Sequence, residues 1–265
     1  MIAKNINMYT LKKDISMRIR SFLFLFSLAS LLFSAYYTPL LARRRKSSSM
    51  RTQIKEQQKE QTLLPTKYPI KQFNFADIAG LSNSQLDQHQ KLYADYINKH
   101  NQIDEKLKFI DRHEANTIYS PFRSLKVSQT YARNGVLLHE LYFENLSTGK
   151  KIQPNTEQLL TKNFGSISAF KKDLMDCANC ARGWVVTSFC IDDRSVKNFV
   201  LDTNNKGVPL LTIPILVIDV YEHAYMIDFG INRAAYIKTI WDSINWDIIE
   251  KRIVKWVKPH ENMSA

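Results

Sequence analysis

The stretch Asp219-Val220-Tyr221-Glu222-His223-Ala224-Tyr225 decides how the rest of this chain is interpreted. It follows an apolar run, residues 210–218, that is rich in β-branched side chains and is typical of a buried strand. A carboxylate and an imidazole four residues apart can converge on one point where such a strand turns toward a helix, and that point can hold a metal ion. Taken alone, the pair favours a structural interpretation, in which Asp219 caps the helix and His223 makes an ordinary hydrogen bond.

The basic charge of the chain is concentrated at its N-terminal end. The 265 residues carry a net charge of +12, yet residues 1–66 contain 12 of the Lys and Arg and only 3 of the Asp and Glu. The remaining residues are nearly balanced and show no basic stripe interleaved with aromatic side chains. This distribution argues against a nucleic-acid partner.

Residues 21–42 form an uncharged run of 22 residues, which is long enough to cross a bilayer. Met17 offers an alternative start directly before a compact basic segment and this run, as in a signal peptide. The sites after Ala35 and Ala42 lack a small residue where cleavage needs one, and residues 43–46 resemble a stop-transfer flank. We therefore expect residues 1–42 to be a signal peptide or a membrane anchor and residues 43–66 a basic polar linker. The protein is expected to be exported, periplasmic or extracytoplasmic, and attached to the membrane if the segment is uncleaved.

The body of the chain predicts an α+β fold with helices first and strands later. Residues 67–153 are expected to form an antiparallel α-hairpin domain, with one helix that runs through residue 101, a second over residues 124–146, and a connection with some helix over 103–118. Ser82 or Asn83 is expected to cap the first of these. Residues 154–265 are expected to form a domain with a three-stranded antiparallel sheet surrounded by helices. Its predicted helices cover residues 155–163, 166–180, 233–244 and 245–257, and its predicted strands cover 183–191, 195–202 and 210–219.

Cys177 and Cys180 form a C-x-x-C pair with no second pair to complete a zinc site. They could be joined in an oxidising compartment, or they are simply small residues on one face of a helix.

One histidine on each hairpin helix completes a candidate ligand set. His89 and His139, with Asp219 and His223, supply three imidazoles and one carboxylate, which suits iron or manganese and leaves a position open for a small substrate. The pair His139-Glu140 begins like a zinc-protease motif, but Phe143 stands where the second histidine is needed.

The longer C-terminal sequence resembles the signature of the iron/manganese superoxide dismutases. The resemblance rests on residues 219–225, on Ile227-Asp228-Phe229-Gly230, on residues 233–238 and on Trp241-Asp242-Ser243-Ile244-Asn245-Trp246, and it extends to residues 139–146 and Gly183-Trp184. It covers about residues 68–256. The resemblance implies disproportionation of superoxide to dioxygen and hydrogen peroxide, one Fe or Mn ion per subunit, and a homodimer or tetramer.

Carried over by residue, the resemblance implies that His89, His139, Asp219 and His223 hold the metal. It places Tyr96 in the substrate channel and Trp184 on an aromatic wall of the site. Glu222 is implied to pair with the partner's His223 across a dimer interface, with Tyr225 in the same segment.

Several positions differ from the usual family pattern. His89 and Tyr96 are seven residues apart instead of eight, which the loss of a one-turn π-bulge would explain while both side chains still face the metal. Tyr93 replaces a histidine and Met226 replaces an aromatic residue at two positions that normally meet across the dimer, so the residues of the usual proton relay are absent there. Tyr221 replaces a tryptophan.

Gly135 replaces the glutamine that iron types carry four residues before the second histidine. The hydrogen-bonding amide must then come from the hairpin region, where Asn204 is the best candidate and Asn205 the next. The residues leave iron and manganese equally open. The main alternative is a membrane-tethered relative that binds metal or dimerises with little dismutase activity, and a zinc hydrolase is a more distant one because no general base accompanies the ligands.

Overall fold

The computed structural model describes residues 67–75 and 78–261. The chain divides into two units, Met1–Thr66 and Lys67–Ala265. The predicted signal peptide or anchor and the predicted linker therefore lie outside the described residues. Within the described ranges, no helix is both long enough and apolar enough to span a bilayer.

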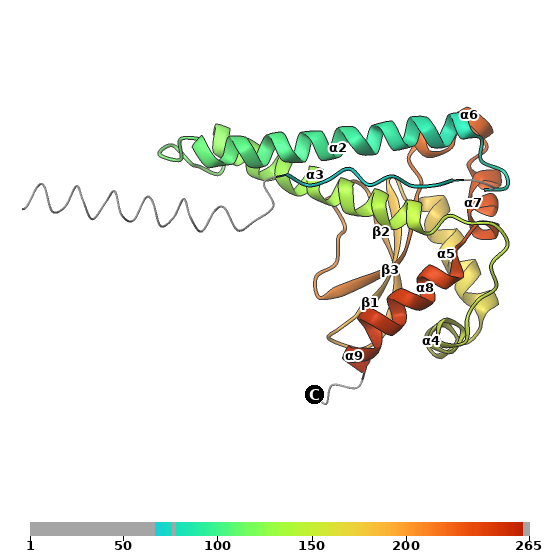
Figure 1. The fold of residues 1–265 in the computed structure, drawn as a ribbon. Coiled ribbons are helices and arrows are strands. Elements are labelled where there is room, and N and C mark those ends of the chain that lie inside the picture. The colour runs from blue at the N-terminus through green and yellow to red at the C-terminus, as the bar shows by residue number, and fades with distance from the viewer. Residues whose placement is uncertain (1–66, 76–77, 262–265) are drawn as a thin grey trace, which may run out of the picture. The chain divides into compact units, whose positions relative to one another are not determined.

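Two long antiparallel helices, α2 (Asn83–Phe109) and α3 (Pro121–Glu144), form the predicted hairpin (Figure 1). Ser82 caps α2, because its side chain accepts a hydrogen bond from the Gln85 amide at 3.1 Å. Ser120 does the same for α3 through the Arg123 amide at 3.1 Å, and Pro121 occupies the first turn, where its missing amide hydrogen is not needed. Firm starts of this kind fix which side chains of each helix face the other.

The rest of the described chain is a three-stranded sheet with helices around it. The strands are β1 (Trp184–Cys190), β2 (Val196–Leu201) and β3 (Thr212–Asp219), in the order β2-β1-β3, and both pairings are antiparallel. The helices are α4 (Pro154–Phe164), α5 (Ile167–Cys180), the short η1 (Glu222–Ala224), α6 (Met226–Phe229), α7 (Arg233–Asp242), α8 (Trp246–Arg252), the π-helical η2 (Ile253–Val257) and α9 (Lys258–Glu261). The predicted α+β class and three-stranded antiparallel sheet are confirmed.

Strand register determines what lies at the C-terminal end of β3. Trp184 pairs with Asp219 across β1 and β3, and with Leu201 across β1 and β2. Every residue of β1 is buried, and β3 is buried from Ile215 to Asp219. Asp219 is therefore delivered into the interior at the edge of the core.

One hydrophobic core contains side chains of both the hairpin and the sheet. Val136 and Tyr142 of α3 belong to the same buried cluster as Val185 of β1 and Ile215 of β3. The predicted division of the body between residues 153 and 154 stays a prediction.

Several predicted boundaries were wrong. The helix α2 continues past residue 101 to Phe109, because Ile103 and Leu107 extend its buried face in a second apolar cluster with Ala132. The expected connection over residues 103–118 is accordingly reduced to residues 110–120. Strand β3 begins at Thr212, after Leu211 adopts a positive φ of 51° that interrupts an extended chain. The last predicted helix, 245–257, is α-helical only to Arg252 and then π-helical.

Candidate metal centre

Four different elements bring His89, His139, Asp219 and His223 together. His89 lies on α2, His139 on α3, Asp219 at the end of β3, and His223 in η1. One ligand atom from each lies within 4.8 Å of the others, and all but His223 are buried. The structure thus places the four sequence-predicted ligands in one cluster.

All three imidazoles point at the same carboxylate oxygen. The Nε2 atoms of His89 and His223 each lie 3.1 Å from Asp219 Oδ2, and the Nε2 atom of His139 lies 3.7 Å from it. The other carboxylate oxygen, Oδ1, accepts the Tyr221 amide at 2.9 Å. Three nitrogens and one oxygen therefore converge, while the second oxygen is held by the backbone.

His139 shows that this donor set fits a metal ion. Its Nδ1 lies 2.6 Å from the Gly135 carbonyl oxygen, so Nδ1 carries the proton and Nε2 presents a lone pair to the cluster. This Nε2 atom is buried and has no hydrogen-bond partner among the described residues. A buried acceptor without a partner is unfavourable unless another group binds it, and a metal ion satisfies that need.

The electrostatics keep most of the set in the form that binds metal. Burial lowers the pKa of His139 from 6.5 to about 3 and also lowers the pKa of His89. Burial opposes ionisation of Asp219, but the neighbouring His223 and the hydrogen bonds from His223 and His89 hold its pKa well below the ordinary value. Two neutral imidazoles and a carboxylate need not lose a proton before binding a cation. The pKa of His223 is raised: burial lowers it, but the Asp219 charge outweighs burial, so a proton competes with a metal ion more strongly at this ligand than at the other two imidazoles.

Trp184 and Asn204 form the wall beside His139. The Trp184 ring meets the His139 ring edge-on at 4.9 Å, and its Nε1 donates to Asn204 Oδ1 at 2.9 Å. Asn204 is fully buried, whereas Asn205 bonds Thr203 in the loop and lies outside this wall. Of the two candidate amides, the structure places Asn204 against the centre.

Gly135 makes room for that amide. A Cβ atom at this position would lie 2.8 Å from Asn204 Nδ2 and 2.7 Å from Tyr96 Cδ1, both closer than side chains tolerate. The missing side chain on α3 and the asparagine after β2 are therefore complementary.

Tyr96 also faces the centre, with its ring centroid 5.2 Å from that of His139. The helix α2 is α-helical between His89 and Tyr96, as expected if no π-bulge separates them. Burial raises the pKa of Tyr96, and a hydrogen bond to Tyr131 raises it further, while the bond from Asn204 opposes this. The two hydroxyl oxygens of Tyr96 and Tyr131 are 3.4 Å apart.

Sequence reasoning missed Tyr131. A signal was present: Tyr131, Gly135 and His139 are spaced by four residues and therefore share one face of α3. Tyr221 stacks on His223 at 5.2 Å, and burial, together with Tyr131 and Asp219, raises the pKa of Tyr221 to about 12.

Two further tyrosines were also missed, because they act from behind the centre. The Tyr236 hydroxyl donates to the Asp219 main-chain oxygen at 2.6 Å, and it lies 3.1 Å from the Tyr142 hydroxyl. Both are buried, so they fix the backbone that carries the carboxylate.

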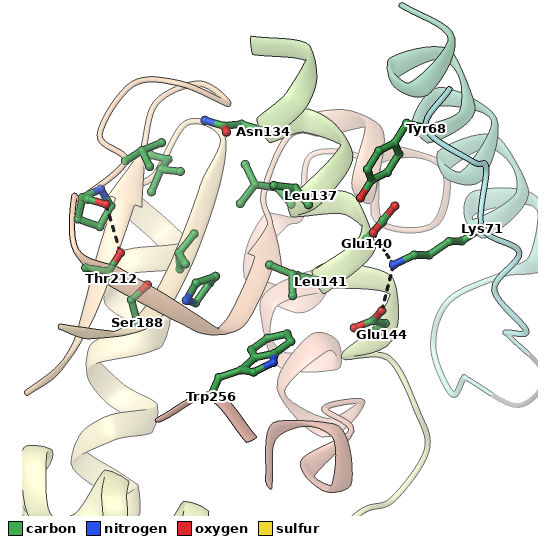
Figure 2. A pocket seen from close by; sticks show the side chains of 16 residues that line it. Tyr68, Lys71, Asn134, Leu137, Glu140, Leu141, Glu144, Ser188, Thr212 and Trp256 are labelled. Atoms are coloured by element: carbon green, nitrogen blue, oxygen red, sulfur yellow. Dashed lines mark hydrogen bonds and ion pairs between the residues drawn. The ribbon is translucent and has the colours of Figure 1, made fainter. Parts of the chain in front are cut away.

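Tyr93 is bonded within its own subunit. Its hydroxyl donates to Glu140 Oε1 at 3.0 Å, and Glu140 Oε2 accepts from Lys71 Nζ at 2.5 Å. Figure 2 shows Lys71 reaching Glu140 and Glu144 beside a groove of about 510 Å³ that also contains Tyr68 and Trp256. None of the four candidate ligands lines this groove.

The remaining predicted residues after β3 differ in their exposure to solvent. Glu222 and Met226 are exposed, whereas Tyr225 is buried and stacks on Tyr236 at 5.0 Å. The side chain of His223 keeps 31% of its surface exposed on the same short segment.

Three imidazole nitrogens and one carboxylate oxygen, brought together by an α-hairpin and a small antiparallel sheet, define a mononuclear non-haem metal centre. Comparison with known proteins narrows this class. Residues 152–252 match the family model of iron/manganese superoxide dismutases, C-terminal domain. The chain is 37% identical over 191 residues to a superoxide dismutase [Fe] of Aquifex pyrophilus, covering 70% of this chain and 90% of the relative.

Two further relatives agree. A superoxide dismutase [Fe] of Aquifex aeolicus (strain VF5) is also 37% identical over 191 residues, with the same coverage of 70% and 90%. A superoxide dismutase [Mn] of Thermus aquaticus is 31% identical over 173 residues, covering 62% of this chain and 83% of the relative. The chain belongs to the iron/manganese superoxide dismutase family.

Proposed function

We propose that this chain disproportionates superoxide at a single Fe or Mn ion held by His89, His139, Asp219 and His223. The observation that carries the proposal is the convergence of three Nε2 atoms on one Asp219 oxygen, with the His139 Nε2 otherwise unpartnered. A bound ion of either metal would supply one-electron chemistry, accepting an electron from one superoxide and giving it to the next. The products are dioxygen and hydrogen peroxide.

The protein's contribution is to hold the ligands, exclude water and direct hydrogen bonds. Trp184 closes one side of the centre. Its indole N–H donates a hydrogen bond to Asn204 Oδ1, which fixes the orientation of the Asn204 amide. This leaves the Asn204 amide hydrogens directed toward Tyr96 and the Tyr131 carbonyl. The Tyr96 ring contacts His139, and the raised pKa of its hydroxyl keeps it protonated at neutral pH and able to donate a proton.

The decisive experiment measures metal and activity together. The purified chain is loaded separately with Fe and with Mn, and its rate of superoxide decay is compared with that of the free ions. We expect a rate far above free metal for at least one form. If neither form exceeds free metal while each holds about one ion per chain, the protein is a metal-binding relative and not a dismutase.

His139→Ala tests the ligand set itself. Under the proposal this variant loses its metal, because one of four ligands and its buried lone pair are gone. His113→Ala is the matched control, since His113 is exposed on the connection between α2 and α3. Metal retained by His139→Ala at the level of His113→Ala would contradict the assignment.

We propose a homodimer in which Glu222 pairs with the partner's His223. Exposure of Glu222 beside a ligand that is itself partly exposed supports this, since a partner carboxylate there would orient the imidazole. Light scattering after gel filtration should give twice the chain mass for the wild type and a smaller value for Glu222→Ala. Glu114→Ala, which removes an exposed carboxylate elsewhere, is the control.

We also propose that residues 1–42 direct export, as a cleaved signal peptide or as an anchor. The uncharged run at residues 21–42 and its basic flanks support this proposal. Cell fractionation with N-terminal sequencing of the recovered protein tests it. An intact N-terminus in the cytoplasmic fraction would rule export out.

A further inference from the structure

A cavity of about 780 Å³ lies between the hairpin helices and the loop after β2. Tyr96 and Tyr131 both line it, together with Thr203, Asn205 and Lys206. Unlike the groove beside Lys71, this cavity contains a residue in ring contact with a candidate ligand. A small anion approaching from this side must therefore pass Tyr96.

Tyr96 separates the cavity from the metal centre. One side of its ring lines the cavity, and the ring also packs against His139 with centroids 5.2 Å apart. Its hydroxyl lies 3.4 Å from the Tyr131 hydroxyl. That distance is long for an O–H···O bond, so the bond is weak enough to open readily.

Tyr131 is fixed at its backbone and accessible at its ring. Its carbonyl accepts a hydrogen bond from Asn204 Nδ2 at 3.3 Å, which ties this turn of α3 to the wall of the centre. The residue keeps 36% of its surface exposed, and it lies near enough to Tyr221 to raise the pKa of that hydroxyl. The rings of Tyr131 and Tyr96 stand 6.0 Å apart, one on each hairpin helix, so their contact bridges α2 and α3 at the cavity.

We propose that Tyr131 is a positioning residue that controls the passage of small anions: its hydroxyl holds Tyr96 between the cavity and His139, and breaking that contact admits the anion. The inference rests on the proposed function, in which a metal ion occupies the four ligands. It concerns the route to the ion and the residue that limits it. This role of Tyr131 does not follow from the four ligands or from the list of residues that line the cavity.

The test measures azide binding to the Fe(III)-loaded full chain by stopped-flow absorbance, which needs no turnover. Tyr131→Phe removes the hydroxyl and keeps the ring, so the association rate constant should rise about two- to fivefold, as expected for one weak hydrogen bond. Tyr119→Phe is the matched control, because Tyr119 is 75% exposed and does not line the cavity. An unchanged rate constant in Tyr131→Phe overturns the proposal.

A double-mutant cycle separates positioning from a general structural effect. Tyr96→Phe removes the other hydroxyl of the same contact, so Tyr96→Phe/Tyr131→Phe should bind azide no faster than Tyr96→Phe alone. Independent, multiplied accelerations would refute action through Tyr96. If the azide results hold while the wild-type chain shows no dismutation with either metal, the positioning role stands and the proposed function fails.

Discussion

Replacing His139 should reduce the loss of folding stability that the metal-free protein undergoes as the pH falls. In the folded chain, burial together with the neighbouring His89 lowers the pKa of this histidine from 6.5 to about 3. The ring is fully buried against Trp184 and Tyr96, so protonation would place a charge where no solvent reaches it. The unfolded chain meets no such obstacle.

The sign and size follow from proton linkage. Between pH 6.5 and about 3 the unfolded chain binds a proton at this position that the folded chain does not, so the free energy of unfolding falls as the pH falls through this window. At about 1.36 kcal/mol for each pH unit, the full window corresponds to about 5 kcal/mol. His223 acts in the opposite sense: its pKa is raised, so its contribution is complete below pH 6.5 and is lost as the pH rises through the folded value.

The assay is urea unfolding of the chelator-treated chain from about pH 7 to about pH 4. His139→Gln removes the titrating group, and His113→Gln removes an exposed histidine as the control. Comparison of the two cancels contributions from titrating groups that contact neither histidine. If the free energy of unfolding of His139→Gln and His113→Gln falls equally with pH, the histidine is not held neutral by burial and the reasoning is wrong.

Three substitutions test the surroundings of the centre by chemical denaturation. Trp184→Phe removes the donor 2.9 Å from Asn204 Oδ1 and should lower the free energy of unfolding by about 1–3 kcal/mol; an unchanged midpoint would contradict the bond. Gly135→Ala should lower the free energy of unfolding by about 1–3 kcal/mol, because contact of the new Cβ with Tyr96 and Asn204 outweighs the gain in helix propensity of about 1 kcal/mol. Net stabilisation would show that the site has room for a methyl group. Arg252→Leu should lower the free energy of unfolding by about 3 kcal/mol, because this buried guanidinium donates to the Leu141 and Ile215 carbonyls; a loss under about 1 kcal/mol would mean that water replaces it.

The strong patterns of the sequence predicted the elements, and tertiary contacts decided their ends. The apolar spacing in α2 was clear to residue 101, but its continuation to Phe109 depends on Ile103 and Leu107 meeting Ala132 of α3, which is a contact between helices. The start of β3 at Thr212 depends on the backbone of Leu211, for which the apolar run gave no sign. Local propensity does not contain either piece of information.

The ligand positions could be predicted because the family resemblance includes all four of them. The residues around the ligands were harder to predict. Asn204 was found by noting that Gly135 offers no side chain, and the structure shows the two in contact range. Tyr131 was not found, because its role depends on a hydroxyl pair across two helices. The bond of Tyr93 to Glu140 within the subunit was not predicted, because it joins residues 47 positions apart and no local pattern reveals it.

The pairing of Trp184 with Asp219 limits how this centre can diverge. Trp184 and Asp219 pair directly across β1 and β3, so a one-residue shift of either strand relative to the other would turn one of the two side chains away from the ligands. Sequence changes that preserve a working centre are therefore expected on the helix faces and in the loop after β2. Three positions that differ from the usual family pattern, Gly135, Tyr93 and Asn204, lie in those regions, where the sheet leaves freedom to change.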